Sequence, residues 1–226
     1  MIKNRTAQII FQSSFCALAV IGLLASLGLF QINEGFRWDF FVHFTNLSNY
    51  FCMVVMFAEL IYVIKKANKQ ESGFCNIWPR LKFIGVVIIT ITLVVYNFIL
   101  APTRPLYLSM RINSILMHLI LPIMYIVDWI LFYEHRKVKW TAPLLTLIFP
   151  LIYIVFIFIR VGIMKAIGEV ATDTNFMYPY FFLNVDKLGI GGLIMWLGIL
   201  LVAFIAVGYL FYFIDRKIKV KVKDHQ

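Results

Sequence analysis

The sequence predicts an all-α integral membrane protein, a bundle of six transmembrane helices with both termini in the cytoplasm. Of its 226 residues, 62% are hydrophobic and only 14% are charged, whereas a soluble domain carries roughly 25% charged residues. Six apolar stretches each approach the ~20 residues that a spanning helix needs. The expected spans are residues 9–30, 40–64, 83–100, 112–133, 142–159 and 188–214, within one domain that covers residues 1–226.

The distribution of lysine and arginine predicts the orientation. Most of the 21 basic residues flank the spans on one side. The other side carries Arg37, Arg104, Arg111, Arg160, Lys165 and Lys187. The positive-inside rule therefore places both termini in the cytoplasm. The net charge of +10 fits a cytoplasmic rim that faces anionic headgroups, and it requires no nucleic-acid partner.

Individual stretches add local expectations. The first is longer than the roughly 7–15 apolar residues of a signal peptide, so we expect a retained span. Pro122 and Pro150 lie inside the fourth and fifth stretches, where each should kink its helix or free a carbonyl. Before the sixth span, the aromatic segment Met177–Leu183 is expected at the membrane interface or folded over the bundle mouth. The cysteines Cys16, Cys52 and Cys75 show neither disulfide nor metal-site spacing.

Two spans carry polar residues at helical spacing. On one face of the second span lie Thr45, Ser48, Asn49, Cys52, Met56 and Glu59, and on one face of the fourth lie Arg111, Ser114, His118, Pro122 and Tyr125. At 1.5 Å per residue, Thr45 lies about 7 Å and His118 about 9 Å from the outer ends of their spans. Asn97 of the third span lies near the same level. Three spans thus contribute to one outer polar layer, which predicts a shared site.

A threonine and a histidine in this layer suggest acyl transfer. A threonine hydroxyl is a weak nucleophile until a base takes its proton, and a buried neutral imidazole suits that role. Asn46, Asn49, Asn97 or Ser114 could donate to the developing oxyanion. The alternative is that these small polar residues only join helices. His118 is the stronger functional candidate, because an ionisable side chain inside a span is costly.

Other ionisable residues lie toward the inner side. Glu59 and Asp128 are close in depth to Lys65, Lys82 and Arg136. The pattern favours an ion-pair layer of snorkelling side chains, and a proton pathway is the alternative. His135 and His225 are expected to be cytoplasmic and solvated.

Three patches carry a resemblance to a known family. They are Phe44–Asn49 (Phe-Thr-Asn-Leu-Ser-Asn), Asn113–Pro122 with its histidine, and Tyr178–Pro179 followed by Phe181–Leu183. In this order and spacing, the chain resembles the bacterial six-helix relatives of the androgen-induced and androgen-dependent TFPI-regulating membrane proteins. The resemblance implies an integral-membrane threonine hydrolase of fatty acid esters of hydroxy fatty acids, with His118 as the family histidine. The family's nucleophile aligns either with Thr45 or with Val42, one helical turn earlier.

The expected function is hydrolysis of a lipid ester in the outer part of the bundle, with Thr45 as nucleophile, His118 as base, and neither metal nor organic cofactor. Residues expected to bind the substrate are Ser48, Asn49, Asn97, Ser114 and Tyr178. The expected partners are membrane lipid and the lipid ester, and the expected location is a bacterial plasma membrane. The alternative is a bundle that binds or transports lipid or a small solute without chemistry. An open polar path between the two layers would favour transport, and a blind outer pocket would favour hydrolysis.

Overall fold

The structure, a computed structural model, describes residues 4–30, 36–69, 77–103, 111–172 and 176–218. Its α-helices are α1 (Arg5–Ser26), α2 (Phe44–Asn68), α3 (Pro79–Val95), α5 (Ile112–Ile115), α6 (Leu121–Phe132), α7 (Ala142–Leu145), α8 (Ile148–Ala166) and α9 (Val185–Lys217). Shorter helical turns are η1 (Trp38–Val42), η2 (Tyr96–Leu100), η3 (Ala101–Thr103), η4 (Leu116–Ile120) and η5 (Phe181–Leu183). Within these ranges the chain forms no strand, so the all-α class is confirmed.

Six helical stretches are long and apolar enough to cross a membrane, as expected. They are Arg5–Ser26, Phe44–Asn68, Pro79–Thr103, Ile112–Phe132, Ala142–Ala166 and Val185–Lys217. The third stretch joins α3 to η2 and η3, and the fourth joins α5, η4 and α6. The protein is therefore a multipass integral membrane protein.

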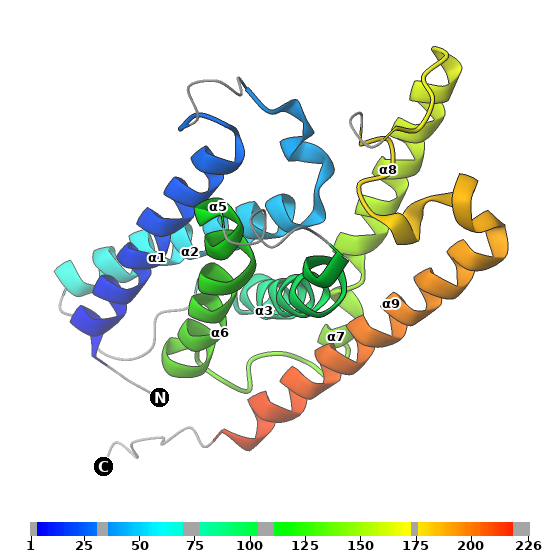
Figure 1. Ribbon diagram of the computed structural model, residues 1–226. Helices are drawn as coiled ribbons and strands as arrows, with labels where there is room; N and C mark the ends of the chain where they lie inside the picture. Colours follow the sequence, from blue (N-terminus) through cyan, green and yellow to red (C-terminus); the bar gives the residue numbers. More distant parts are fainter. Residues whose placement is uncertain (1–3, 31–35, 70–76, 104–110, 173–175, 219–226) are drawn as a thin grey trace.

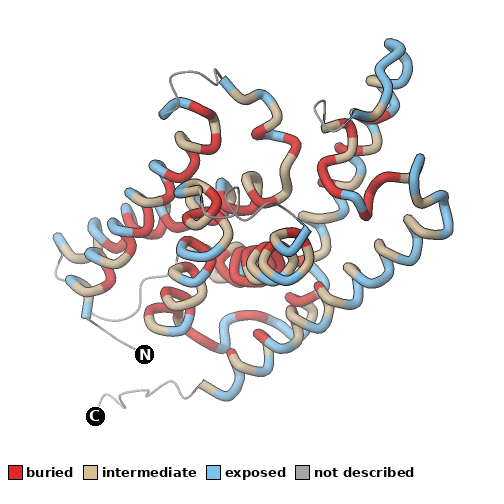
Figure 2. Tube along the Cα trace, in the orientation of Figure 1, coloured by how far each residue is buried: buried red, intermediate tan, exposed pale blue. Residues whose placement is uncertain are grey.

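The helices form a ring with two outlying members (Figure 1). Helix α1 contacts α2 and α6, and α3 contacts the same two, so that the four enclose a common centre. Helix α9 runs along the outside against α3 and α7, and α8 diverges from the bundle (Figure 1). Figure 2 shows that α8 and α9 are exposed along most of their length, whereas the inward faces of the ring are buried. The exposed faces are apolar, as lipid contact requires.

The buried apolar residues form two cores. The larger fills the ring and includes the fully buried Phe83, Ile88 and Trp129. The smaller joins η1 and η2 to α8, η5 and α9 through residues such as Tyr153 and Tyr180.

The first span is shorter than expected because of a glycine cap. Helix α1 ends at Ser26 rather than residue 30. Gly28 has φ 82°, and the N–H groups of Gly28 and Leu29 return to the carbonyls of Ala25 and Leu24. This is the pattern of a Schellman cap, which a glycine adopts without steric cost.

The other boundary differences also have local causes. The second span begins at Phe44 rather than residue 40, since His43 is extended and the preceding residues form the η1 turn. The fifth continues past residue 159 to Ala166, where Gly168 at φ 84° forms a second cap. The sixth stretch begins at Val185 rather than residue 188, because the Asn184 side chain accepts the N–H of Lys187. Gly189, at φ 66°, then kinks the helix.

Candidate functional site

His118 lies on a broken turn of the fourth span. In the π-helical turn η4, the N–H of Leu121 bonds to the carbonyl of Leu116, five residues back. Pro122 has no N–H to donate. The carbonyls of Met117 and His118 therefore lose their usual helical partners, as the proline in this apolar stretch predicted.

Two asparagine side chains replace the missing donors. Asn49 Nδ2 on α2 donates to the carbonyl oxygen of Met117 at 2.9 Å. Asn97 Nδ2 on η2 donates to the carbonyl oxygen of His118 at 2.9 Å. Since an unpaired buried carbonyl costs about 1–3 kcal/mol, these bonds hold the broken turn against α2 and η2. Both η4 and η2 are π-helical, a conformation that often occurs at functional sites.

The imidazole of His118 is held in one orientation. Its Nδ1 lies 2.8 Å from the carbonyl oxygen of Ser114, and its ring stacks on Tyr96 with the ring centroids 3.3 Å apart. The oxygens of Tyr96 Oη and Ser114 Oγ are 2.6 Å apart. Because a carbonyl oxygen only accepts, the neutral ring carries its proton on Nδ1 and keeps the lone pair on Nε2. This tautomer can act as a base at Nε2.

Thr45 and His118 line the same polar cavity, which has a volume of about 380 Å³. Its other polar lining residues include Arg37, Asp39, His43, Asn46, Arg111 and Ser114. The guanidinium of Arg37 pairs with Asp39, with Nη2 and Oδ2 2.9 Å apart. Thr45 is 6% exposed. The cavity thus joins a hydroxyl, an imidazole and cationic groups at the outer polar layer.

A second, apolar cavity of about 440 Å³ adjoins the first. Side chains of α2, α3, α8 and α9 line it, among them Ile91, Leu151, Leu197 and Phe204. Four residues line both cavities: Thr45, Tyr96, Leu100 and Tyr180. The hydroxyl-bearing Thr45 therefore lies at the border between a polar chamber and an apolar groove.

The structure separates the predicted site residues into two groups. Thr45, Ser114 and His118 line the polar cavity, whereas Val42 does not. Instead, Val42 is buried in the smaller apolar core, and its carbonyl accepts the Tyr153 hydroxyl at 2.8 Å. Of the two candidate nucleophile positions, Thr45 and Val42, only Thr45 lines the polar cavity together with His118.

The remaining predicted substrate-binding residues lie outside both cavity linings. Ser48 is fully buried and bonds to Thr92 Oγ1 at 2.9 Å, while Asn49 and Asn97 hold the broken turn. Tyr178 lies on the outer rim, where its hydroxyl donates to Asp186 Oδ2 at 3.1 Å and partial burial raises the pKa of its phenol. Their roles in substrate binding stay predictions.

Sequence reasoning missed the aromatic part of the site. Tyr96 carries no sequence signal of its own, although it is one residue before Asn97 and stacks on His118. Tyr180 belongs to the aromatic segment Met177–Leu183, and it lines both cavities.

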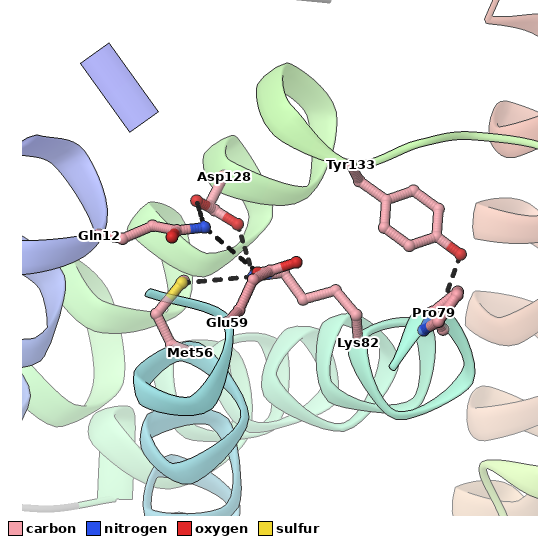
Figure 3. A network of polar contacts seen from close by, with 7 residues as sticks. All are labelled: Gln12, Met56, Glu59, Pro79, Lys82, Asp128 and Tyr133. Atoms are coloured by element: carbon pink, nitrogen blue, oxygen red, sulfur yellow. Dashed lines mark hydrogen bonds and ion pairs between the residues drawn. The ribbon is translucent and has the colours of Figure 1, made fainter. Parts of the chain in front are cut away.

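The ion pairing expected at the inner side is confirmed for Lys82, which pairs with both Glu59 and Asp128 (Figure 3). Two other expectations for this side are wrong. Lys82 does not snorkel to the surface, because it is only 1% exposed. His135 is not solvated: it is 2% exposed, and its Nδ1 lies 2.9 Å from Asp215 Oδ1. Both are buried because another helix supplies a carboxyl partner for the side chain, which hydropathy cannot reveal. His225 lies outside the described residues.

Within the described ranges, no three His, Cys, Asp or Glu side chains are grouped as metal ligands would be. Comparison of the chain with known protein families, curated proteins and solved structures finds no match.

Proposed function

We propose that the protein hydrolyses a lipid ester within the membrane, with Thr45 as nucleophile and His118 as general base. The observation that carries the proposal is the position of Thr45, which lines both the polar cavity of His118 and the apolar groove. A fatty acid ester needs both a polar cavity and an apolar groove, because polar groups must surround its reacting carbonyl and apolar side chains must surround its acyl chain. The resemblance to the threonine hydrolases suggests fatty acid esters of hydroxy fatty acids as substrates.

The chemistry follows from the tautomer of His118. Nδ1–H donates to the carbonyl of Ser114, so Nε2 accepts the Thr45 hydroxyl proton as Oγ1 attacks the acyl carbonyl. We propose that Asn46 and Arg111, which line the cavity, donate to the oxyanion. The imidazolium then returns the proton to the departing alcohol. Water, activated by the same Nε2, cleaves the acyl-threonine and restores both groups.

The shape of the cavities favours hydrolysis over transport. Neither cavity is lined by Glu59, Lys82 or Asp128. On α2, the fully buried Cys52 and Met56 lie between Thr45 and Glu59. A cavity confined to the outer layer supports a site for chemistry rather than a path across the bundle. The distribution of basic residues supports cytoplasmic termini, and we place the protein in a bacterial plasma membrane.

Labelling by an alkyl fluorophosphonate probe tests the proposed nucleophile. We expect labelling of the wild type and of Thr45→Ser, and none of Thr45→Ala or His118→Ala, since both the hydroxyl and its base are needed. Ser14→Ala is the control, because Ser14 is exposed on α1 and its hydroxyl donates to the carbonyl of Ile10. Size-exclusion profiles identify variants that fail to fold. Equal labelling of the wild type, Thr45→Ala and His118→Ala would remove the proposed pair.

The apolar groove predicts a dependence on acyl-chain length. Gly198 lines the groove, and a Cβ atom added there meets nothing within 4 Å. Gly198→Leu should therefore fold and fill part of the groove, which would lower kcat/KM for long-chain esters about tenfold or more, as loss of one to two kcal/mol of apolar binding implies. Hydrolysis of short-chain esters should be unchanged.

Gly162→Leu is the matched control for this prediction. Gly162 also has open space around its added Cβ, but it lies on α8 and does not line the groove. A series of ester substrates of increasing acyl length provides the measurement. An equal effect of both variants on long-chain esters would contradict the role of the groove.

A further inference from the structure

The two cavities that meet at Thr45 have different chemistry. Each described residue that lines the apolar groove is uncharged, whereas arginine, aspartate, histidine and asparagine side chains line the polar cavity. Among the described lining residues of the polar cavity, only Phe40, Leu100 and Phe176 lack a polar side-chain group. An ester that reacts at Thr45 extends in two directions from its carbonyl carbon, into an acyl part and an alcohol part. The two parts therefore meet different surroundings.

The polar cavity is a poor site for a long alkyl chain. Arg37 and Asp39 line it as an ion pair, and their side chains keep 33% and 19% of their surface exposed. Hydrocarbon laid over this pair would remove water from both charges and return no hydrogen bond. The acyl chain therefore belongs in the apolar groove, and the alcohol part in the polar cavity is itself polar.

The Arg37–Asp39 pair offers hydrogen-bond donors and acceptors side by side. Asp39 accepts from Nε and Nη2 of Arg37, at 3.3 Å and 2.9 Å, so Nη1 of the guanidinium still has N–H groups to donate, and each carboxylate oxygen has a further lone pair. A hydroxyl group both donates and accepts, so neighbouring hydroxyl groups can bond to both members of the pair. A carboxylate or phosphate would instead be repelled by Asp39, and an ammonium by Arg37. The pair therefore favours a neutral group that carries hydroxyls.

Backbone contacts hold the pair in place. The N–H of Arg37 donates to the carbonyl of Leu27, at the end of α1, at 3.0 Å. Asp39 lies in η1, and its carbonyl oxygen is 2.9 Å from Nδ1 of His43, the residue that precedes α2. The pair is thus fixed between α1 and α2 before a ligand arrives, which lowers the cost of binding.

We propose that the substrate is the fatty acyl ester of a small neutral polyol, of which a monoacylglycerol is the simplest, with its hydroxyl groups bound by Arg37 and Asp39. This inference rests on the proposed function, since it names the ester that Thr45 cleaves. The polyol takes the place of the hydroxy fatty acid that the family resemblance suggests. Thr45 Oγ1 bonds to the acyl carbon, the bond from that carbon to the polyol oxygen breaks, and the polyol leaves with the proton from His118. Water then releases the fatty acid.

Binding to Thr45→Ala, which is expected to be inactive, tests the inference without turnover. The probe is radiolabelled monopalmitoylglycerol, and the protein is held in lipid nanodiscs. The competitors carry the same acyl chain: methyl palmitate, hexadecyl palmitate and the palmitate ester of hydroxystearic acid. We expect the glycerol ester to bind at least about tenfold more tightly than each competitor, because the other alcohol parts leave the hydrogen bonds to the ion pair unmade.

Asp39→Asn in the same background identifies the site. The substitution keeps the size of the side chain and removes its charge, so binding of monopalmitoylglycerol should weaken about tenfold, whereas binding of methyl palmitate should not change. A merely structural role of Asp39 would weaken both. Glu134→Gln is the matched control, because it makes the same change from carboxylate to amide in a loop, where Glu134 Oε1 lies 3.1 Å from Lys137 Nζ.

Hydrolysis by the wild type separates this inference from the proposed function. We expect kcat/KM to be at least about tenfold higher for monopalmitoylglycerol than for methyl palmitate. Similar rates for all four esters, or tighter binding of the hexadecyl or hydroxystearate ester, would overturn the inference and leave the hydrolase in place. Binding of the glycerol ester that depends on Asp39, without hydrolysis, would remove the hydrolase and keep the polyol site. Equal binding by Asp39→Asn and Glu134→Gln would also overturn the inference.

Discussion

Replacement of Lys82 by methionine is expected to destabilise the folded protein by about 3–5 kcal/mol, because it removes the ammonium that pairs with two buried carboxyl groups. Lys82 is 1% exposed and lies within ion-pair distance of both Glu59 and Asp128. Methionine nearly matches the length of the lysine stem, so packing is largely kept. Reversible unfolding in mixed micelles, with rising denaturing detergent, measures the loss.

Two further variants separate charge from packing. Lys137→Met removes an exposed lysine whose Nζ lies 3.1 Å from Glu134 Oε1, and it should change stability by less than about 1 kcal/mol. The triple variant Lys82→Met, Glu59→Gln and Asp128→Asn removes all three charges and should recover most of the loss. If Lys82→Met were no less stable than Lys137→Met, the ion pairs of Lys82 would not hold the bundle together.

Replacement of Gly85 by alanine is expected to cost about 1–3 kcal/mol through overpacking between α3 and α6. A Cβ atom at Gly85 would meet Tyr125 Cζ at 2.8 Å, and it would lie even closer to the hydroxyl oxygen. Tyr125 is fully buried and its ring lies under the Lys82 ammonium, so it cannot easily withdraw. The two helices would have to separate, which also disturbs the ion pairs of Lys82.

The partner substitution makes this prediction specific. Tyr125→Phe removes the oxygen atom nearest to the added methyl group, and that oxygen has no hydrogen-bond partner among the described residues. Gly85→Ala should therefore cost less in the Tyr125→Phe background than in the wild type, although the ring carbons still restrict it. Gly162→Ala, where the added Cβ meets nothing, should be neutral or slightly stabilising. Equal costs of Gly85→Ala in both backgrounds would show that Tyr125 is not the obstacle.

The sequence by itself determined the number of spans and the two polar layers. Long apolar stretches have few alternatives in a bilayer, because every backbone group must be paired within its own helix. Pro122 likewise predicted that one backbone carbonyl of the fourth span lacks its helical hydrogen-bond donor. Helical spacing placed Thr45, Asn49 and Glu59 on one face of α2. These inferences depend only on residues near one another in the chain.

Only the tertiary structure decided which side chains meet. Asn49 and Asn97 are bonded to the carbonyls of the broken turn rather than exposed to the cavity. Lys82 is buried between two acids rather than extended to the surface. The apolar groove exists only because α8 and α9 lie apart beside the ring. Hydropathy is the same for a side chain that faces lipid, a cavity or another helix, so the choice among these follows from how the helices pack.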